Sequence, residues 1–254
     1  MPDFPPTNVA PTPSRGARLF VRLLIGVTIC YAMMIGYFLW LVPPPGINTV
    51  EASSSFTERC RRICEKYGLI PSGNVKRDAE EFLNAVKKED KDLELPESSH
   101  PLILQPAPDF ELLDDAEKPI RFSKFRGSGP ALIVFYFGYH CPHCVAQLFG
   151  LKDDYAAFEK LGIRIIAVSS DPPSETSAKF DEFGRFPFTV VADPDDIVAK
   201  KYGCYATTAD ASGTLQLHGT FLVDRAGIIR WAETGEQPFT NNSALLRRAA
   251  TLVP

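Results

Sequence analysis

The sequence predicts an α/β domain, in which helices cover both faces of a central sheet, preceded by one transmembrane helix. Three observations carry this prediction. The run Ala131–Phe137 is continuously apolar, as in a central strand buried on both faces. Strand-like and helix-like segments alternate along the rest of the C-terminal half. Near the N-terminus, some twenty uncharged and mostly apolar residues follow one another.

The strands of the sheet are expected from short apolar runs bounded by turn residues. A hairpin is predicted from Phe110–Leu113 and Ile120–Phe122, joined across a polar turn at residues 114–117. After the central strand, further strands are expected at Arg164–Ser169, Phe188–Val191, Thr220–Val223 and Ile228–Trp231. Apolar residues that step by four and three predict the buried face of a long helix: Cys144, Leu148, Leu151, Tyr155 and Phe158. Other helices fit at about 174–184, 195–202 and 242–252.

The apolar run at residues 19–42 is long enough for a helix that crosses a hydrocarbon core of about 30 Å. Three arginines lie on its N-terminal side: Arg15, Arg18 and Arg22. The positive-inside rule therefore predicts a cytoplasmic tail at residues 1–18 and an extracytoplasmic location, periplasmic in a bacterium, for everything after the span. The alternative is a cleaved signal peptide, with a weak cleavage site at Ala52-Ser53-Ser54.

Residues 43–105 are predicted to be a helical segment and a linker, and residues 106–254 the main domain. Helical spacing is seen at Phe56, Cys60, Ile63, Cys64 and Tyr67, and again at Ala79, Phe82, Leu83 and Val86. Pro71-Ser72-Gly73 divides the segment into two helices. Cys60 and Cys64 fit either a helix face, a local disulfide or a second redox pair. Cys204 fits a buried apolar position or an extra resolving thiol.

Composition argues against two classes of protein. A formal charge of −4 and a pI near 5.6 argue against a nucleic-acid partner. Six cysteines in 254 residues are too few for a scaffold built from disulfides, so the cysteine chemistry is local.

That chemistry is predicted at His140-Cys141-Pro142-His143-Cys144, where the central strand ends and the next helix begins. The N–H groups and dipole of a helix N-terminus stabilise a thiolate on the first cysteine. The second cysteine, one turn later, is placed to attack a mixed disulfide formed on the first. A structural zinc site is the alternative, and it would need Cys60 and Cys64 as a second pair.

Several motifs together resemble the redoxin group, which comprises the AhpC/TSA peroxiredoxins and related membrane-tethered thioredoxin-like proteins. The resemblance covers about residues 106–235 and rests on these stretches: Ala107-Pro108-Asp109-Phe110, Phe125-Arg126-Gly127, Ala167-Val168-Ser169-Ser170-Asp171, Phe186-Pro187-Phe188, Ala192-Asp193-Pro194 and Gly219-Thr220-Phe221-Leu222-Val223-Asp224. It implies a thioredoxin-like, peroxiredoxin-type fold and an oxidoreductase with antioxidant activity that needs no organic cofactor.

The departures from the family pattern decide which activity the resemblance favours. Peroxiredoxins carry P-x-x-x-T-x-x-C, whose cysteine falls on Cys144, while Cys141 replaces the threonine and Phe137 the proline. The family's activating arginine falls at about His218. We therefore predict a thiol–disulfide oxidoreductase in which Cys141 attacks, Cys144 resolves and the two form the redox-active disulfide. Its partners would be protein thiols or disulfides, or a thioredoxin-like reductant. Pro142, His143, His140 and His218 are expected to tune thiol pKa values or contact the substrate.

Two alternatives stay open. A thiol peroxidase would reduce hydroperoxides at Cys144 or Cys141 with an external reductant. The stretch from Phe135 to Pro142, with His218 before the later strand, also resembles the Sco-type copper chaperones. That resemblance implies copper held by Cys141, Cys144 and His218, two soft thiolates and an imidazole, although the spacing C-x-x-C departs from the C-x-x-x-C of those chaperones.

Overall fold

The computed structural model describes residues 28, 31, 33–34, 56–89, 94–207 and 214–252. The chain divides into two compact units, Met1–Pro44 and Pro45–Pro254. In the first unit only Thr28, Tyr31, Met33 and Met34 are described, all of them helical, so the predicted tail and most of the predicted span lie outside the described residues. Among the residues that are described, no helix has the length and apolar character needed to cross a bilayer. The finer domain boundaries stay a prediction.

The second unit is built on a seven-stranded sheet with the order β2-β1-β5-β4-β3-β8-β9. The strands are β1 (Glu111–Asp114), β2 (Pro119–Arg121), β3 (Ala131–Tyr136), β4 (Arg164–Ser169), β5 (Thr189–Ala192), β8 (His218–Val223) and β9 (Ile229–Gly235). β3 pairs in parallel with β4 and antiparallel with β8. The predicted hairpin is confirmed as the antiparallel pair β1–β2, and the apolar run from Ala131 is a strand buried at every position.

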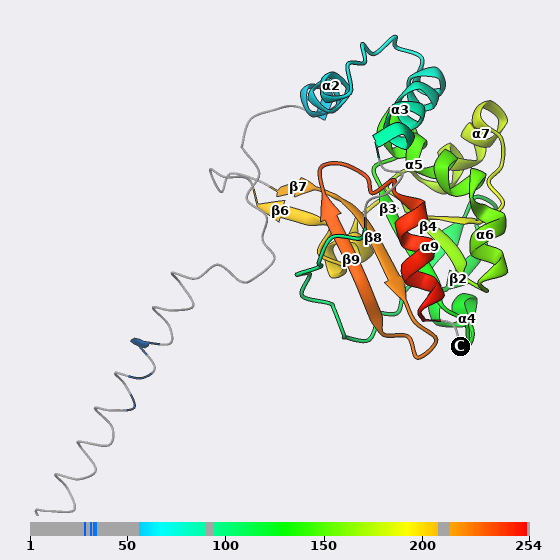
Figure 1. The fold of residues 1–254 in the computed structure, drawn as a ribbon. Helices are drawn as coiled ribbons and strands as arrows, with labels where there is room; N and C mark the ends of the chain where they lie inside the picture. Colours follow the sequence, from blue (N-terminus) through cyan, green and yellow to red (C-terminus); the bar gives the residue numbers. More distant parts are fainter. Residues whose placement is uncertain are drawn as a thin grey trace, which may run out of the picture. The chain divides into compact units, whose positions relative to one another are not determined.

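Two hydrophobic cores lie on opposite faces of this sheet because side chains alternate along each strand. Leu132, Val134 and Tyr136 of β3 join the first core, whereas Ala131, Ile133 and Phe135 join the second. Figure 1 shows helices on both sides of the sheet, as predicted for this fold class. The first core is covered by α5 (Pro142–Asp153), α6 (Tyr155–Lys160), α7 (Pro173–Phe183) and α9 (Asn242–Ala250), and the second by α4 (Phe122–Arg126) and α8 (Ile197–Lys201).

The structure differs from the sequence prediction in two local features. The long helix after the cysteines is divided at Asp154, whose backbone angles of φ −97° and ψ 5° lie outside the α region. Phe158 is nevertheless fully buried, so the predicted apolar face is kept. A small two-stranded sheet, β6 (Tyr205–Thr207) with β7 (Thr214–Gln216), was not expected from the sequence.

The helical segment before the main domain forms α2 (Phe56–Lys66) and α3 (Val75–Glu89), divided at the predicted break. α3 packs along α5, next to which it is drawn in Figure 1. The inward face of α2 is the predicted one: Ile63 and Cys64 are buried, and Cys60 and Tyr67 pack against the first core. The segment is therefore part of the same core as the strand and helix that carry the paired cysteines.

Candidate active site

The paired cysteines occupy the first turn of α5. Cys141 is the N-cap residue, and its Sγ accepts a hydrogen bond from the backbone N–H of Cys144 at 3.4 Å. Pro142 follows at the first helical position, where a missing N–H costs nothing and the fixed φ favours helix. The local sequence thus begins the helix at Cys141 and places both sulfurs at its N-terminus, where the helix dipole favours a thiolate.

The turn that leads into this helix depends on Gly138 and Asp171. Gly138 has φ +128°, and a Cβ at this position would overlap the carboxylate of Asp171. That carboxylate accepts the backbone N–H of Tyr139 at 2.8 Å. Asp171 follows β4, the parallel neighbour of β3, so both strands end at the same edge of the sheet and Asp171 can hold the turn before Cys141.

His218 contacts Cys144. It begins β8, and its Nε2 lies 3.0 Å from the Cys144 Sγ. The imidazole also packs on Phe137, with ring centroids 4.1 Å apart, and is 2% exposed. One turn further along α5, the amide of Gln147 donates to Thr220 Oγ1 at 3.0 Å, which ties α5 to β8 beside the histidine.

His143 and α2 lie on the other side of the pair. The His143 ring is fully buried and packs edge-on against Phe82 of α3. Its Nδ1 lies 4.0 Å from the Cys141 Sγ, and its Nε2 lies 3.2 Å from the Cys64 Sγ. The Sγ of Cys60, the Sγ of Cys141 and a ring nitrogen of His143 all lie within 4.8 Å of one another. Four thiols and two imidazoles therefore form one cluster.

Burial and hydrogen bonding raise the pKa of three of these thiols. It raises the pKa of the Cys141 thiol well above its ordinary value. It also raises the pKa of the Cys64 thiol, to about 11. The pKa of Cys60 is raised chiefly by the hydrogen bond with the Cys141 thiol and then by burial. Cys141, Cys60 and Cys64 are therefore protonated at neutral pH in the reduced protein.

The structure brings together most of the residues that the sequence singled out. Cys141, Cys144, His143 and His218 meet in the first core, and Pro142 sets the helix start. His140 differs, because its side chain is exposed. Cys204 is fully buried in the second core, on the opposite face of the sheet, so it is placed as an apolar residue and not as a resolving thiol.

The three residues of the copper alternative are also close together. The Sγ atoms of Cys141 and Cys144 and a ring nitrogen of His218 lie within 4.8 Å of one another, and all three residues are buried. Two thiolates and one imidazole are donors that suit Cu(I). The geometry is therefore compatible with the ligand set that the resemblance implied.

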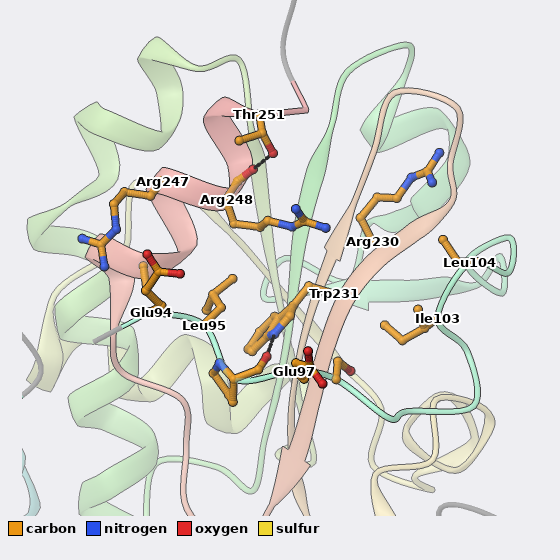
Figure 2. Close-up of a pocket in the computed structure, with 13 residues that line it drawn as sticks. Glu94, Leu95, Glu97, Ile103, Leu104, Arg230, Trp231, Arg247, Arg248 and Thr251 are labelled. Carbon is orange, nitrogen blue, oxygen red and sulfur yellow. Dashed lines mark hydrogen bonds between the residues drawn. The ribbon is translucent and has the colours of Figure 1, made fainter. Parts of the chain in front are cut away.

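A surface cavity of about 600 Å³ lies elsewhere, between the linker at residues 94–104, β9 and α9. Figure 2 shows the Trp231 indole on its wall, donating to the Pro96 carbonyl, and the Arg248 guanidinium reaching toward β9. No cysteine lines this cavity, so the thiol chemistry is not performed there.

Sequence reasoning missed Gly138, Asp171 and Gln147, and left the role of Cys60 and Cys64 open. Signals for two of them exist in the sequence. A glycine directly after a buried strand indicates an unusual turn, and an aspartate at the end of the next parallel strand lies at the same sheet edge. Gln147 carries no such signal, because its partner Thr220 is 73 residues away.

A sheet with parallel and antiparallel strands, covered by helices on both faces and carrying a dithiol at a helix N-terminus, defines a thioredoxin-like protein of the peroxiredoxin type. A model of the AhpC/TSA family matches residues 103–232, half of the chain, and the chain belongs to this family. The prediction of an enzyme of the peroxiredoxin-like antioxidant type is confirmed at the level of this family.

Curated proteins that are similar to the chain include several peroxiredoxins. A chloroplastic peroxiredoxin Q of Populus jackii is 33% identical over 126 residues, which are 50% of this chain and 57% of the relative. A putative peroxiredoxin bcp of Haemophilus influenzae is 34% identical over 125 residues, 48% of this chain and 79% of the relative. The chain thus spans little more than half the length of the Populus protein.

Among solved structures, peroxidoxin BcpB of Mycobacterium tuberculosis matches with a TM-score of 0.51 and 22% identity, over 61% of this chain and 97% of that one. Peroxiredoxin Q of Xanthomonas campestris matches with a TM-score of 0.52 and 18% identity, over 57% and 92%. These likenesses establish the fold.

The predicted localisation, a single-pass membrane protein with an extracytoplasmic redoxin domain, is wrong. The Populus relative is a chloroplastic peroxiredoxin, and the described residues contain no helix able to cross a bilayer. The prediction rested on the hydropathy of one run, at residues 19–42, and on the arginines at its N-terminal side. Hydropathy measures preference for apolar surroundings of any kind, and a bilayer is only one of them.

Proposed function

We propose that the chain is a thiol peroxidase in which Cys144 attacks a hydroperoxide. The observation that carries the proposal is the 3.0 Å contact between the His218 Nε2, at the start of β8, and the Sγ of Cys144, in the first turn of α5. Cys144 is the thiol in direct contact with a basic side chain that lies where peroxiredoxins carry their activating arginine. An imidazole in this position can take up the thiol proton as the sulfur attacks and, next to the reacting atoms, can supply a proton to the leaving oxygen.

The reaction balances with the residues present. The Cys144 thiolate attacks one peroxide oxygen, the O–O bond breaks, and the alkoxide or hydroxide leaves with a proton, so that Cys144 becomes a sulfenic acid. The Cys141 thiol then attacks the Cys144 sulfur, releases water and forms the Cys141–Cys144 disulfide. Cys141 is placed for this step because it lies one turn away at the same helix end. A dithiol reductant of the thioredoxin-like class returns two electrons.

The burial of Cys141 and Cys144 favours a small substrate over a protein substrate. Both Cys141 and Cys144 are 0% exposed, and they share the first core with Phe137, Tyr139 and residues of α2 and α3. A hydroperoxide can enter such a site after a small local opening, whereas the disulfide of a folded protein needs a larger opening to reach either sulfur. The raised pKa of the Cys141 thiol argues in the same direction, because it lowers the thiolate fraction of the residue that the oxidoreductase prediction made the attacking thiol.

The relatives lend further support to a peroxidase, since the Populus and Haemophilus proteins carry the name peroxiredoxin.

Thiol–disulfide exchange between proteins, the activity favoured from the sequence, uses the same two cysteines and stays compatible with the fold. The two activities differ in which sulfur attacks first, Cys144 for the peroxidase and Cys141 for exchange.

The first test is single-turnover oxidation of the reduced, full-length protein by hydrogen peroxide. We expect one equivalent to be consumed, a Cys141–Cys144 disulfide to form, and the rate to exceed that of free cysteine by a factor of at least about 10². A rate equal to that of free cysteine would overturn the proposal.

Matched serine variants identify the attacking sulfur. Cys141→Ser should accumulate a sulfenic acid on Cys144 that dimedone traps, because the resolving thiol is gone. Cys144→Ser should react with peroxide at the rate of an unactivated thiol. Sulfenic acid found on Cys141 of the Cys144→Ser protein, at the wild-type rate, would favour the opposite order of attack.

Copper binding is a second candidate, favoured by the closeness of Cys141, Cys144 and His218. If the chain is a copper chaperone, the reduced protein binds one Cu(I) that survives competition with the chelator bicinchoninate, and His218→Gln loses it. Removal of Cu(I) by the chelator at equal concentrations would exclude this function.

A further inference from the structure

The buried dithiol raises a problem of access. A hydroperoxide is small, but the reductant in the proposed cycle is a protein dithiol, and neither sulfur of the Cys141–Cys144 pair is exposed. α2 covers the pair and carries Cys60 on the face that packs against the first core. Cys60 is only partly buried, whereas Cys64, Cys141 and Cys144 are buried. Cys60 is thus the thiol of this cluster that borders on solvent.

Resting on the proposed function, we propose that Cys60 is a third redox-active thiol, which takes over the disulfide from Cys144 and presents it to a protein dithiol at the surface. The Sγ atoms of Cys60 and Cys141 lie within 4.8 Å of each other, so a movement of α2 by less than about 3 Å brings them to bonding distance. A ring nitrogen of His143 lies within the same 4.8 Å of both sulfurs.

The steps conserve atoms and electrons. The Cys60 thiol gives up its proton, its sulfur attacks the Cys141 sulfur, the Cys141–Cys144 bond breaks, and Cys144 leaves as a thiolate. One disulfide has replaced another, with no net oxidation. The reductant's first thiolate then attacks the Cys60 sulfur, and Cys141 leaves and is protonated. The reductant's second thiol attacks its own mixed disulfide, which restores the Cys60 thiol and transfers two electrons to the protein.

Cys64 is not placed to attack the Cys141 sulfur. It lies one turn along α2, and its Sγ contacts the His143 Nε2 at 3.2 Å, while the opposite ring nitrogen, Nδ1, faces Cys141. The imidazole therefore separates Cys64 from the Cys141 sulfur, and Cys64 is also only 2% exposed. It is a matched control, with the same side chain on the same helix.

The linkage can be tested without peroxide. Full-length Cys144→Ser protein is oxidised with diamide, alkylated and digested with trypsin, which separates Cys60 from Cys64 because Arg61 and Arg62 lie between them. We expect the Cys60–Arg61 dipeptide to be disulfide-linked to the Gly127–Lys152 peptide, which contains Cys141. Cys141 left reduced, or linked to the peptide that contains Cys64, would overturn the inference.

The kinetic test compares Cys60→Ser and Cys60→Ala with Cys64→Ser. Each protein is oxidised with one equivalent of hydrogen peroxide, and its reduction by thioredoxin is followed. Both Cys60 variants should be reduced more slowly by roughly tenfold or more, and Cys64→Ser at the wild-type rate. Reduction of both Cys60 variants at the wild-type rate would overturn the inference.

The two proposals fail separately. If peroxide forms the Cys141–Cys144 disulfide in wild-type protein but thioredoxin reduces the Cys60 variants normally, the peroxidase stands and the role of Cys60 falls. If peroxide does not oxidise the pair in any variant, the peroxidase falls, and the diamide linkage still decides whether Cys60 exchanges with Cys141.

Discussion

The Nε2 atom of His218 lies 3.0 Å from the Sγ atom of Cys144, with both residues buried and 74 positions apart in the sequence. β8 carries the histidine and α5 the cysteine, and the buried Gln147–Thr220 hydrogen bond fixes these two elements against each other. The contact is therefore built into the packing of strand and helix. It places an imidazole that can accept or donate a proton directly beside the first-turn thiol.

Replacing His218 by glutamine should slow single-turnover oxidation by peroxide by roughly 10²-fold, the range that a positioned acid or base contributes. Glutamine keeps a hydrogen-bonding group but cannot carry the positive charge. The matched control is His140→Gln, an exposed histidine in the same motif, which should keep the wild-type rate. Stopped-flow measurement at several pH values checks both. Equal rates for His218→Gln and wild type would contradict the role of the imidazole.

Gly138→Ala should disrupt the turn before Cys141. The new Cβ would overlap the Asp171 carboxylate, and φ +128° is strained for any L side chain. We expect a loss of more than about 3 kcal/mol in the free energy of unfolding, measured with urea. Gly162→Ala is the control, because Gly162 has φ +69° but no atom within 4 Å of the added Cβ. It should lose only about 1 kcal/mol. Equal losses would show that the overlap with Asp171 is relieved at no cost.

The elements that could be predicted from the sequence are those with strong local patterns. The apolar run of β3 and the apolar steps of α5 each contain their own signal, and the hairpin β1–β2 follows from its turn residues. The division of the helix at Asp154 could not be predicted, because the apolar spacing continues unbroken across it.

In the candidate site too, the local features could be predicted from the sequence and the tertiary ones could not. The dithiol and its place at a helix N-terminus are local features, and the family resemblance placed His218 near it. The covering of the site by α2 is a tertiary feature. An amphipathic face shows that a helix packs against something, but not what it packs against, and Cys64 lies 79 residues from His143. The membrane prediction failed for a related reason, because hydropathy does not identify the apolar surroundings.

The stability of the protein should fall at alkaline pH, partly through Cys64. Burial raises the pKa of this thiol to about 11 in the folded state, against about 8.5 in an unfolded chain. Between these values the unfolded state releases the proton and the folded state keeps it. The contribution of Cys64 to the free energy of unfolding is therefore fully present below about pH 8.5, and it is lost as the pH rises toward 11.

Cys64→Val removes the titrating thiol, so its unfolding free energy should depend less steeply on pH over this window than that of the wild type. Urea unfolding under reducing conditions measures the two slopes. Ile63→Val is the control, because it removes one buried methyl group from the same helix without touching a titrating group. It should cost about 1 kcal/mol at every pH. Parallel curves for Cys64→Val and wild type would contradict the raised pKa.

The cover that α2 forms over the dithiol should control the access of small reagents to it. Ile63 is 6% exposed and packs in the first core, so Ile63→Ala weakens the docking of α2 and should raise the alkylation rates of Cys141 and Cys144 by about tenfold in the native protein. Val198→Ala is the control, because Val198 belongs to the second core on the opposite face of the sheet. That variant should leave both rates within about twofold of the wild type, since local opening of α2 does not involve α8. Pulsed labelling with N-ethylmaleimide, followed by peptide mapping, measures these rates. If the two variants expose the cysteines equally, the opening is global unfolding and α2 does not act as a separate cover.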